Sequence, residues 1–264
     1  MTYLDRLSVY LGDRYSATYV HTTENQAERF LRIVGVKPAY NRDDILAYVN
    51  KLSHDGIKAS SIRTMIAAVK VLLYANQLPW PLDRRDMHLG KGNEENVAPA
   101  LSVEEVRTLI RAVRGMGPPE EQSVALASIW GFRTAEIAWV LSHGCSGQLQ
   151  HVPIKGGKTR QHGIYPPLKE VMRFKAKEIT REGMHKVFLR LMKRHVRDPR
   201  PREGFHSIRR TLATALFETG LHPYKIHRYM NWKIAEIGGV YFKMPMEQIE
   251  MEIWPVHPFR GAWG

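Results

Sequence analysis

Apolar residues spaced three and four apart recur along most of this 264-residue chain, next to polar residues that can cap a helix. This spacing puts the apolar side chains on one face of a helix, and it therefore predicts a largely helical protein. In the first part of the chain, Thr23 with Gln26 and Asn41 with Asp44 form capping-box patterns, and a third helix is predicted to follow residues 60–61. No internal repeat or low-complexity segment argues against this interpretation.

A segment rich in glycine and polar residues interrupts the helical pattern at 91–100, and Ser102 with Glu105 then forms another capping box. A stretch of this composition between periodic segments is typical of a linker. The length of the chain allows two domains of ordinary size, with 44% apolar residues to build their cores. We therefore expect a helical domain over residues 1–90 and a second domain over residues 101–264.

The second part of the chain continues the helical pattern. Helices are predicted at about 102–115 and 119–141. A further helix, Ser207–Thr219, ends at Gly220, a favourable residue directly after a helix. A last amphipathic stretch is predicted at Met246–Trp254.

A β-hairpin is predicted within this second part. Two short strand-like segments, Leu149–Ile154 and Arg160–Tyr165, flank the turn Lys155-Gly-Gly-Lys158. Paired glycines supply the positive φ that a tight turn requires. The predicted fold class is therefore mainly α with a small antiparallel β-sheet.

The chain is strongly basic, with a formal net charge of +13. Residues 151–210 carry 17 Lys and Arg against five acidic residues, which is almost the whole excess. A basic run is often a solvated face, but here it is mixed with apolar residues and glycine turns, which favours a surface that faces phosphate groups. We expect a polyanionic partner, and the composition excludes a mainly disordered chain.

The sequence also limits the setting in which the protein works. No apolar run approaches the roughly 18 residues of a membrane span, and Asp5 and Arg6 lie where a signal peptide needs an apolar centre. We expect a soluble, intracellular protein. Its one cysteine, Cys145, excludes an internal disulfide and a zinc site built from several thiolates.

The first of three polar clusters that can carry chemistry is Gly131-Phe-Arg-Thr-Ala-Glu. Arg133 and Glu136 lie three residues apart, so they share one face of a helix. Such a pair is most often a surface ion pair. The surrounding residues are apolar, however, which puts Arg133 at the edge of a core, where an arginine needs a partner.

The second cluster, His206-Ser-Ile-Arg209, starts a helix. The free amide groups of a helix N-terminus suit a phosphate, although a capping histidine beside surface arginines is the alternative. The third cluster contains Trp232, which precedes Tyr241 by nine residues. A single tyrosine in a helical stretch is ordinarily a core or interface residue, so each cluster alone is weak evidence.

Together the clusters resemble the tyrosine recombinases, also called phage integrases, and the resemblance covers nearly the full chain. In that family a Gly-x-Arg-x-x-Glu motif, a hairpin lysine, a His-x-x-Arg motif, a His or Trp and a C-terminal tyrosine follow in this order. The matching residues here are Arg133 with Glu136, Lys155, His206 with Arg209, Trp232 and Tyr241. Lys158 lies in the same turn as Lys155, so the choice between these lysines stays open.

The resemblance implies a helical core-binding domain followed by a mixed α/β catalytic domain, of the simple Xer-like type without an arm-binding domain. It implies site-specific DNA recombination through a 3′-phosphotyrosyl intermediate and a Holliday junction. Tyr241 would be the nucleophile, Lys155 the general acid for the leaving 5′-oxygen, and His206 a base or hydrogen-bond partner.

The remaining motif residues would support that chemistry. Arg133 and Arg209 would each donate two hydrogen bonds to the phosphoryl oxygens, where negative charge develops. Trp232 would contribute an indole N–H and packing, and Glu136 would orient His206 or its neighbours. No cofactor and no metal is expected, because side-chain cations do here what magnesium would do.

The expected partner is double-stranded DNA with a specific recombination site, contacted by Lys70, Lys158, Arg160 and Arg210 among others. Four protomers would hold two synapsed sites, with or without accessory DNA-bending proteins and without any membrane. We expect the protein in the cytoplasm, at the nucleoid, or in the host cytoplasm if a virus or mobile element encodes it. The apolar segment 242–264 would dock on the next protomer, or would pack on its own domain.

Two other interpretations remain open at this stage. A type IB topoisomerase-like enzyme would relax supercoils through the same nucleophile. A regulator or architectural protein could keep the fold without turnover. Four residues, His143, Cys145, His151 and His162, imitate a zinc site, but ordinary loop residues explain them better because only one thiol is available.

Overall fold

The structure is a computed structural model, and it describes residues 1–83, 86, 99–145, 149–153, 159–174, 178–232 and 244–264. The chain divides into two compact units, Met1–Asn96 and Val97–Gly264. Each unit has a hydrophobic core of its own, so each is described by itself.

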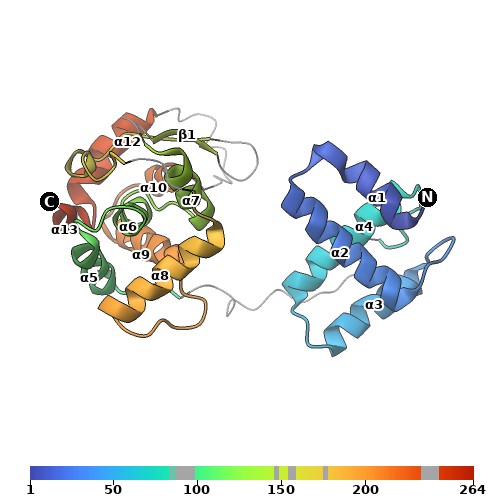
Figure 1. The fold of residues 1–264 in the computed structure, drawn as a ribbon. Helices are drawn as coiled ribbons and strands as arrows, with labels where there is room; N and C mark the ends of the chain where they lie inside the picture. Colours follow the sequence, from blue (N-terminus) through green and yellow to red (C-terminus); the bar gives the residue numbers. More distant parts are fainter. Residues whose placement is uncertain (84–85, 87–98, 146–148, 154–158, 175–177, 233–243) are drawn as a thin grey trace. The chain divides into compact units, whose positions relative to one another are not determined.

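The described part of the first unit is helical. Its elements are α1 (Tyr3–Leu11), the 3-10 turn η1 (Gly12–Arg14), α2 (Ala17–Val34), α3 (Arg42–His54) and α4 (Ala59–Ala75). The helix α2 packs against α1, α3 and α4 (Figure 1). Fully buried residues such as Leu7, Phe30 and Tyr48 come from different helices and fill the space between them. The apolar faces that the sequence shows thus meet in one core.

In the first unit, local capping was predicted correctly at one helix start and wrongly at another. Asn41 caps α3, and its side chain and that of Asp44 form the expected capping box. The predicted cap at Thr23 is wrong, because α2 already begins after Ser16, whose hydroxyl accepts a hydrogen bond from the amide of Tyr19. Thr23 is instead a buried residue inside α2.

The second unit is built around one central helix. The α-helices of its described part are α5 (Val103–Val113), α6 (Glu120–Ser128), α7 (Thr134–His143), α8 (Arg181–His195), α9 (Phe205–Glu218), α10 (Pro223–Tyr229), α12 (Met246–Ile253) and α13 (Arg260–Trp263). Every residue of α6 from Glu121 to Ser128 is buried. The helices α5, α7, α8 and α9 surround it (Figure 1).

The single helix predicted over 119–141 is wrong. The chain leaves α6 after Ser128 and starts α7 only at Thr134, with Arg133 at the N-cap position. Between them Gly131 has a φ of +60°, which a right-handed helix cannot contain. The break frees main-chain carbonyl groups that an unbroken helix would have used.

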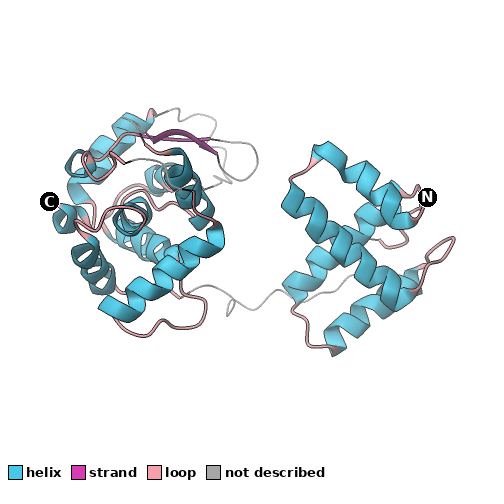
Figure 2. Cartoon of the chain, viewed as in Figure 1, coloured by secondary structure: helices cyan, strands magenta, loops and turns pink. Residues whose placement is uncertain are grey.

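The predicted hairpin is present in the described residues. Strand β1 (Leu149–Pro153) pairs with β2 (Thr159–His162) in an antiparallel register that is irregular between Gln150 and Val152 (Figure 2). The mainly helical class with one small sheet is therefore confirmed. The turn residues Lys155 and Lys158 lie outside the described residues. No helix in the described part of the chain is both long enough and apolar enough to span a bilayer.

The C-terminal elements pack on their own unit. Residues Ile249 and Ile253 of α12 are buried in the core of the second unit. After the 3-10 turn η4 (Trp254–Val256), the imidazole of His257 contacts the carbonyl of Ile129 at 3.0 Å, and the indole of Trp263 donates to the hydroxyl of Ser128 at 3.1 Å. Residues 244–264 therefore pack on their own unit in this chain, and docking on a next protomer stays a prediction.

Candidate active site

A pocket of about 220 Å³ lies along α9. Its walls come from one face of α9 and from the residue that follows α10 and a short turn: His206, Arg209, Arg210, Ala213, Thr214, Phe217 and Trp232. Spacings of three and four along α9 put its members on the same side of the helix. The structure therefore brings three of the predicted catalytic residues, His206, Arg209 and Trp232, and the predicted DNA contact Arg210 to one pocket.

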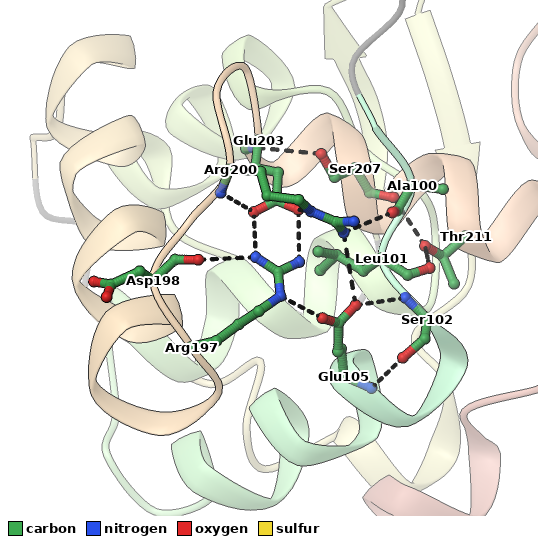
Figure 3. A network of polar contacts seen from close by, with 11 residues as sticks. Ala100, Leu101, Ser102, Glu105, Arg197, Asp198, Arg200, Glu203, Ser207 and Thr211 are labelled. Carbon is green, nitrogen blue, oxygen red and sulfur yellow. Dashed lines mark hydrogen bonds and ion pairs between the residues drawn. The ribbon is translucent and has the colours of Figure 1, made fainter.

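A buried carboxylate holds the loop that leads into α9 (Figure 3). Glu203 accepts from both terminal nitrogens of Arg197, at 2.7 and 2.9 Å, and from the Nε and main-chain N–H of Arg200. Arg197 also donates to Glu105 of α5 at 2.6 Å. Burial alone would raise the pKa of Glu203, but the hydrogen bonds from the two arginines outweigh it and bring that pKa to about 2. The start of α9, with His206, is thereby tied to α5.

Arg209 is almost fully buried at the inner wall of the pocket. Its Nη2 donates to the carbonyl of Met230 at 2.6 Å, and its Nη1 donates to the carbonyl of Gly131. A guanidinium has five donors, so these two bonds leave others for a ligand. Burial, and then the charges of Arg160 and Arg133, lower the pKa of Arg209 to about 9, which still leaves it cationic at neutral pH.

Arg133 and Glu136 form the pair that their spacing predicted. The buried Glu136 carboxylate accepts from the Arg133 main-chain N–H at 2.9 Å and from its Nη1 at 2.8 Å. The Arg133 side chain remains 37% exposed, so it can also meet a ligand. Glu136 was expected to orient His206 or its neighbours, and its oxygens bond Arg133 and Arg160 rather than His206 itself.

Gly131 is needed where the chain breaks between α6 and α7. A Cβ at this position would lie 2.7 Å from the terminal carbon of Met230, in addition to the strain of a positive φ. Its carbonyl accepts from Arg209 and, at 3.4 Å, from Arg160. The glycine of the Gly-x-Arg motif thus lets the main chain approach two arginines.

Arg160 corrects one prediction. It was expected to contact DNA, but its side chain is fully buried. Its terminal nitrogens donate to Glu136 at 3.0 Å and to the carbonyls of Trp130 and Tyr229 at 2.8 and 2.9 Å. A basic residue in a basic segment gives no sign of such burial, because the acceptors come from distant parts of the chain.

Two functional candidates were missed at the sequence level. His162 of β2 and Glu250 of α12 are both buried, with His162 Nδ1 and Glu250 Oε1 2.8 Å apart. The sequence indicated His162 only as part of an imitation zinc site. Among the described residues, no three His, Cys, Asp or Glu side chains are grouped to hold a metal ion.

The other predicted site residues lie in different places. His206 reaches solvent, and partial burial of its ring together with the charges of Arg209 and Arg133 lowers its pKa, so the imidazole is neutral at pH 7. Arg210 lines the same pocket. Lys70, in the first unit, lies over the ring of Trp80 at 5.9 Å. Lys155, Lys158 and Tyr241 lie outside the described residues.

This arrangement is suited to an anion with several oxygens. A buried guanidinium (Arg209), a neutral imidazole and an indole face one pocket, and the Arg209 guanidinium lies 5.9 Å from the ring centroid of Trp232. The charge of Arg133 is close enough to lower the pKa of both Arg209 and His206. Fixed cations of this kind stabilise charge that develops on a phosphoryl group without reorganising.

Comparisons with known proteins establish the fold. No family model and no curated protein matches the chain. Among solved structures, it is similar to a lambda integrase dimer bound to a COC′ core site, with a TM-score of 0.59 and 16% identity over 90% of this chain and 93% of the other. It is also similar to the Tn1549 transposon integrase in complex with transposon right end DNA, with a TM-score of 0.56 and 15% identity over 96% and 98%. The chain therefore has the tyrosine recombinase fold, as its motif order predicted.

Proposed function

We propose that this protein is a site-specific recombinase that breaks and rejoins DNA strands through a tyrosine. The observation that carries the proposal is the meeting of His206, Arg209 and Trp232 at one pocket, with Arg133 within electrostatic range. These residues are far apart in the sequence, yet they are the ones that the motif order selects. The shared fold with integrases in complex with DNA supports the same partner here.

The chemistry follows from the charges of the pocket. The Tyr241 oxygen attacks the phosphorus of a DNA phosphodiester, and the 5′-oxygen of the next nucleotide leaves. A 3′-phosphotyrosyl bond forms as the phosphorus–oxygen bond breaks, so the bond energy is kept and no nucleotide cofactor is needed. The leaving oxygen takes a proton from Lys155 or Lys158.

The described residues act on the transition state of that step. Arg133 and Arg209 donate to the non-bridging oxygens, where a removed donor typically costs about 3 kcal/mol of barrier. The neutral His206 can accept the tyrosine proton or donate to the phosphate. Trp232 provides an N–H donor and covers one side of Arg209. In the second half of the reaction a 5′-hydroxyl of a different strand attacks the phosphotyrosine, which exchanges the strands.

The biological unit in this proposal is a tetramer on two double-stranded DNA sites. Strand exchange needs four cleavages, one by each protomer, and a Holliday junction between two pairs of them. The basic excess of residues 151–210 would face the DNA backbone. Arg210, at the pocket, and Lys158 are proposed as backbone contacts near the cleaved phosphate, and Lys70 as a contact from the first unit.

The test uses a pool of DNA duplexes with randomised sequence and a nick close to the randomised segment. Cleavage next to the nick releases a short fragment and traps the protein on DNA, so an adduct that survives denaturing electrophoresis accumulates. Wild type should form it without added metal or ATP, and Tyr241→Phe should not. Tyr224→Phe, another tyrosine of the second unit, should form it as wild type does.

Two outcomes would count against the proposal. An adduct that forms equally with Tyr241→Phe would remove the nucleophile, and the absence of any adduct with wild type would remove the cleavage activity. In a separate assay with supercoiled plasmid, recovery of relaxed plasmid with no recombined product would instead favour the topoisomerase-like relaxing enzyme.

A further inference from the structure

A continuous path of hydrogen bonds runs from the C-terminal helix to the exposed arginine of the site. Glu250 Oε1 lies 2.8 Å from His162 Nδ1, and His162 Nε2 lies 3.2 Å from Arg160 Nη2. Arg160 Nη1 donates to Glu136 Oε2 at 3.0 Å, and Glu136 Oε1 accepts from Arg133 Nη1 at 2.8 Å. Every member except Arg133 is buried.

The direction of the hydrogen bonds is fixed by the charges. Burial, and then the charge of Arg160, hold the pKa of His162 well below its usual value, so the imidazole is neutral. A neutral imidazole has one donor and one acceptor nitrogen. Arg160 can only donate, so Nε2 of His162 accepts, and Nδ1–H donates to Glu250 in the ionised form of that carboxyl, whose pKa burial raises to about 7. The Gly163 main-chain N–H donates to the same carboxylate at 3.1 Å.

Arg160 also connects this path to the main chain of the second unit. It donates to carbonyls of two separate segments, that of Trp130 in the loop after α6 and that of Tyr229 at the end of α10. Arg209 donates to the adjacent carbonyls, Gly131 and Met230. The two arginines therefore hold the same two loops, and the orientation of Arg160 sets where Glu136, and with it Arg133, can lie.

The path starts at Glu250, which lies on α12, so it also depends on where α12 packs. This helix contacts β2 and α10, and Figure 1 shows it beside the hairpin. Glu250 is its one buried polar residue, and it bonds β2 through both His162 and Gly163. In the sequence, α12 starts five residues after Tyr241.

We propose that His162 and Arg160 are positioning residues that set the Arg133 guanidinium, and that Glu250 makes this setting depend on the placement of α12 against β2. The inference rests on the proposed function for its effect on catalysis. In this proposal Arg133 contacts the DNA phosphate, and its orientation depends on whether α12 is packed against β2.

The test changes the hydrogen-bonding groups of the side chain at position 162 and keeps the size of that side chain nearly constant. His162→Leu removes both bonds, whereas His162→Gln offers one donor and one acceptor as the neutral imidazole does. The matched control is His257→Leu, since His257 is equally buried and hydrogen-bonded but lies outside the path. All variants are compared at a temperature at which each is folded.

Two readouts are followed on the full chain. The first is the single-turnover rate of adduct formation on the nicked duplex pool, beside the dissociation constant for the same DNA. The second is nitrogen NMR of the arginine guanidinium groups without DNA, with the Arg133 signal assigned by its loss in Arg133→Lys. The second readout needs no activity, so it separates a failure of this inference from a failure of the proposed function.

We expect His162→Leu to slow adduct formation by about tenfold or more, because misplacing a catalytic group by an ångström has effects of that size and above. DNA affinity should change by less than about twofold, and the Arg133 signal should move. His162→Gln should recover most of the rate and the signal, and His257→Leu should keep both. Should His162→Leu not fold, Arg160→Lys replaces it, with the same expected loss.

The inference is overturned if His162→Leu, or Arg160→Lys in its place, behaves as His257→Leu does in both readouts. It is also overturned if His162→Gln is as impaired as His162→Leu. If wild type forms no adduct, the proposed function fails, and the Arg133 signal alone decides whether the path positions that arginine.

Discussion

Arg160 and Arg209 show how this protein keeps positive charge inside its core. Both side chains are almost completely buried, and a buried charge is costly unless it is paired and hydrogen-bonded. Arg160 has Glu136 and three carbonyls as acceptors, while Arg209 has two carbonyls and lines the pocket. The arginine with a carboxylate partner is thus structural, and the one without is left for a ligand.

His257 is a single residue that should make the free energy of unfolding depend on pH. Its Nδ1 accepts from the Phe259 N–H, and its Nε2 donates to the Ile129 carbonyl, so the buried ring is neutral. Burial lowers its pKa to about 4, whereas the unfolded chain binds the proton near 6.5. The free energy of unfolding should therefore fall as the pH drops from about 6.5 to about 4, by up to about 3 kcal/mol from this group.

Urea unfolding over that pH range measures the effect, with His257→Gln as the comparison. The variant cannot titrate at this position, so its stability should depend on pH less steeply than that of wild type, by up to one proton. Contributions from His162 and from Glu250, whose pKa is raised to about 7, are common to both chains and cancel. Equal slopes would show that His257 is not held neutral.

At the scale of elements, the start of α9 depends on a clamp rather than on a cap. Its N-cap position is Gly204, which has no side chain to bond the first amides. Glu203, immediately before it, instead gathers Arg197 and Arg200, and Thr211 of α9 donates to the carbonyl of Leu101 at 2.7 Å (Figure 3). These contacts join the loop, α9 and the segment before α5, so they set where His206 lies.

Glu203→Gln should therefore destabilise the second unit and displace the start of α9. It removes the charge that two arginines share, and loss of one partner of a buried pair costs about 3 kcal/mol. The native pKa of about 2 lies below the ordinary value of 4.5, so the wild-type contribution is full above pH 4.5 and is lost as the pH falls toward 2. Thermal unfolding at pH 7 and at pH 3 should show a large gap between wild type and variant at pH 7 and a smaller one at pH 3. An equal difference in stability between wild type and variant at both pH values would contradict this role of Glu203.

At the scale of the whole molecule, sequence patterns correctly predicted the features that depend on residues close together in the sequence. The capping boxes at Asn41 and Ser102 and the hairpin strands use contacts within a few residues, and all are present. The break between α6 and α7 was missed because Ile129, Trp130 and Phe132 are buried too, so the apolar pattern continues through it.

The centre of the candidate site was only partly predictable for the same reason. The order of motifs selects Arg133, His206, Arg209 and Trp232, but it carries no information on the burial of Arg160. That burial depends on acceptors 24 to 69 residues away, which are brought together only when the second unit packs. The path from Glu250 to Arg133 spans several elements, and only its last link, between Glu136 and Arg133, follows from a local spacing.

The proposed function depends most on one covalent bond between this chain and DNA. Protease digestion of the trapped adduct, followed by mass spectrometry of the peptide that carries nucleotides, identifies the attached residue directly. We expect Tyr241 to carry the DNA through a 3′-phosphate. Nucleotides on any other residue, or a wild-type chain that is never found attached, would contradict it.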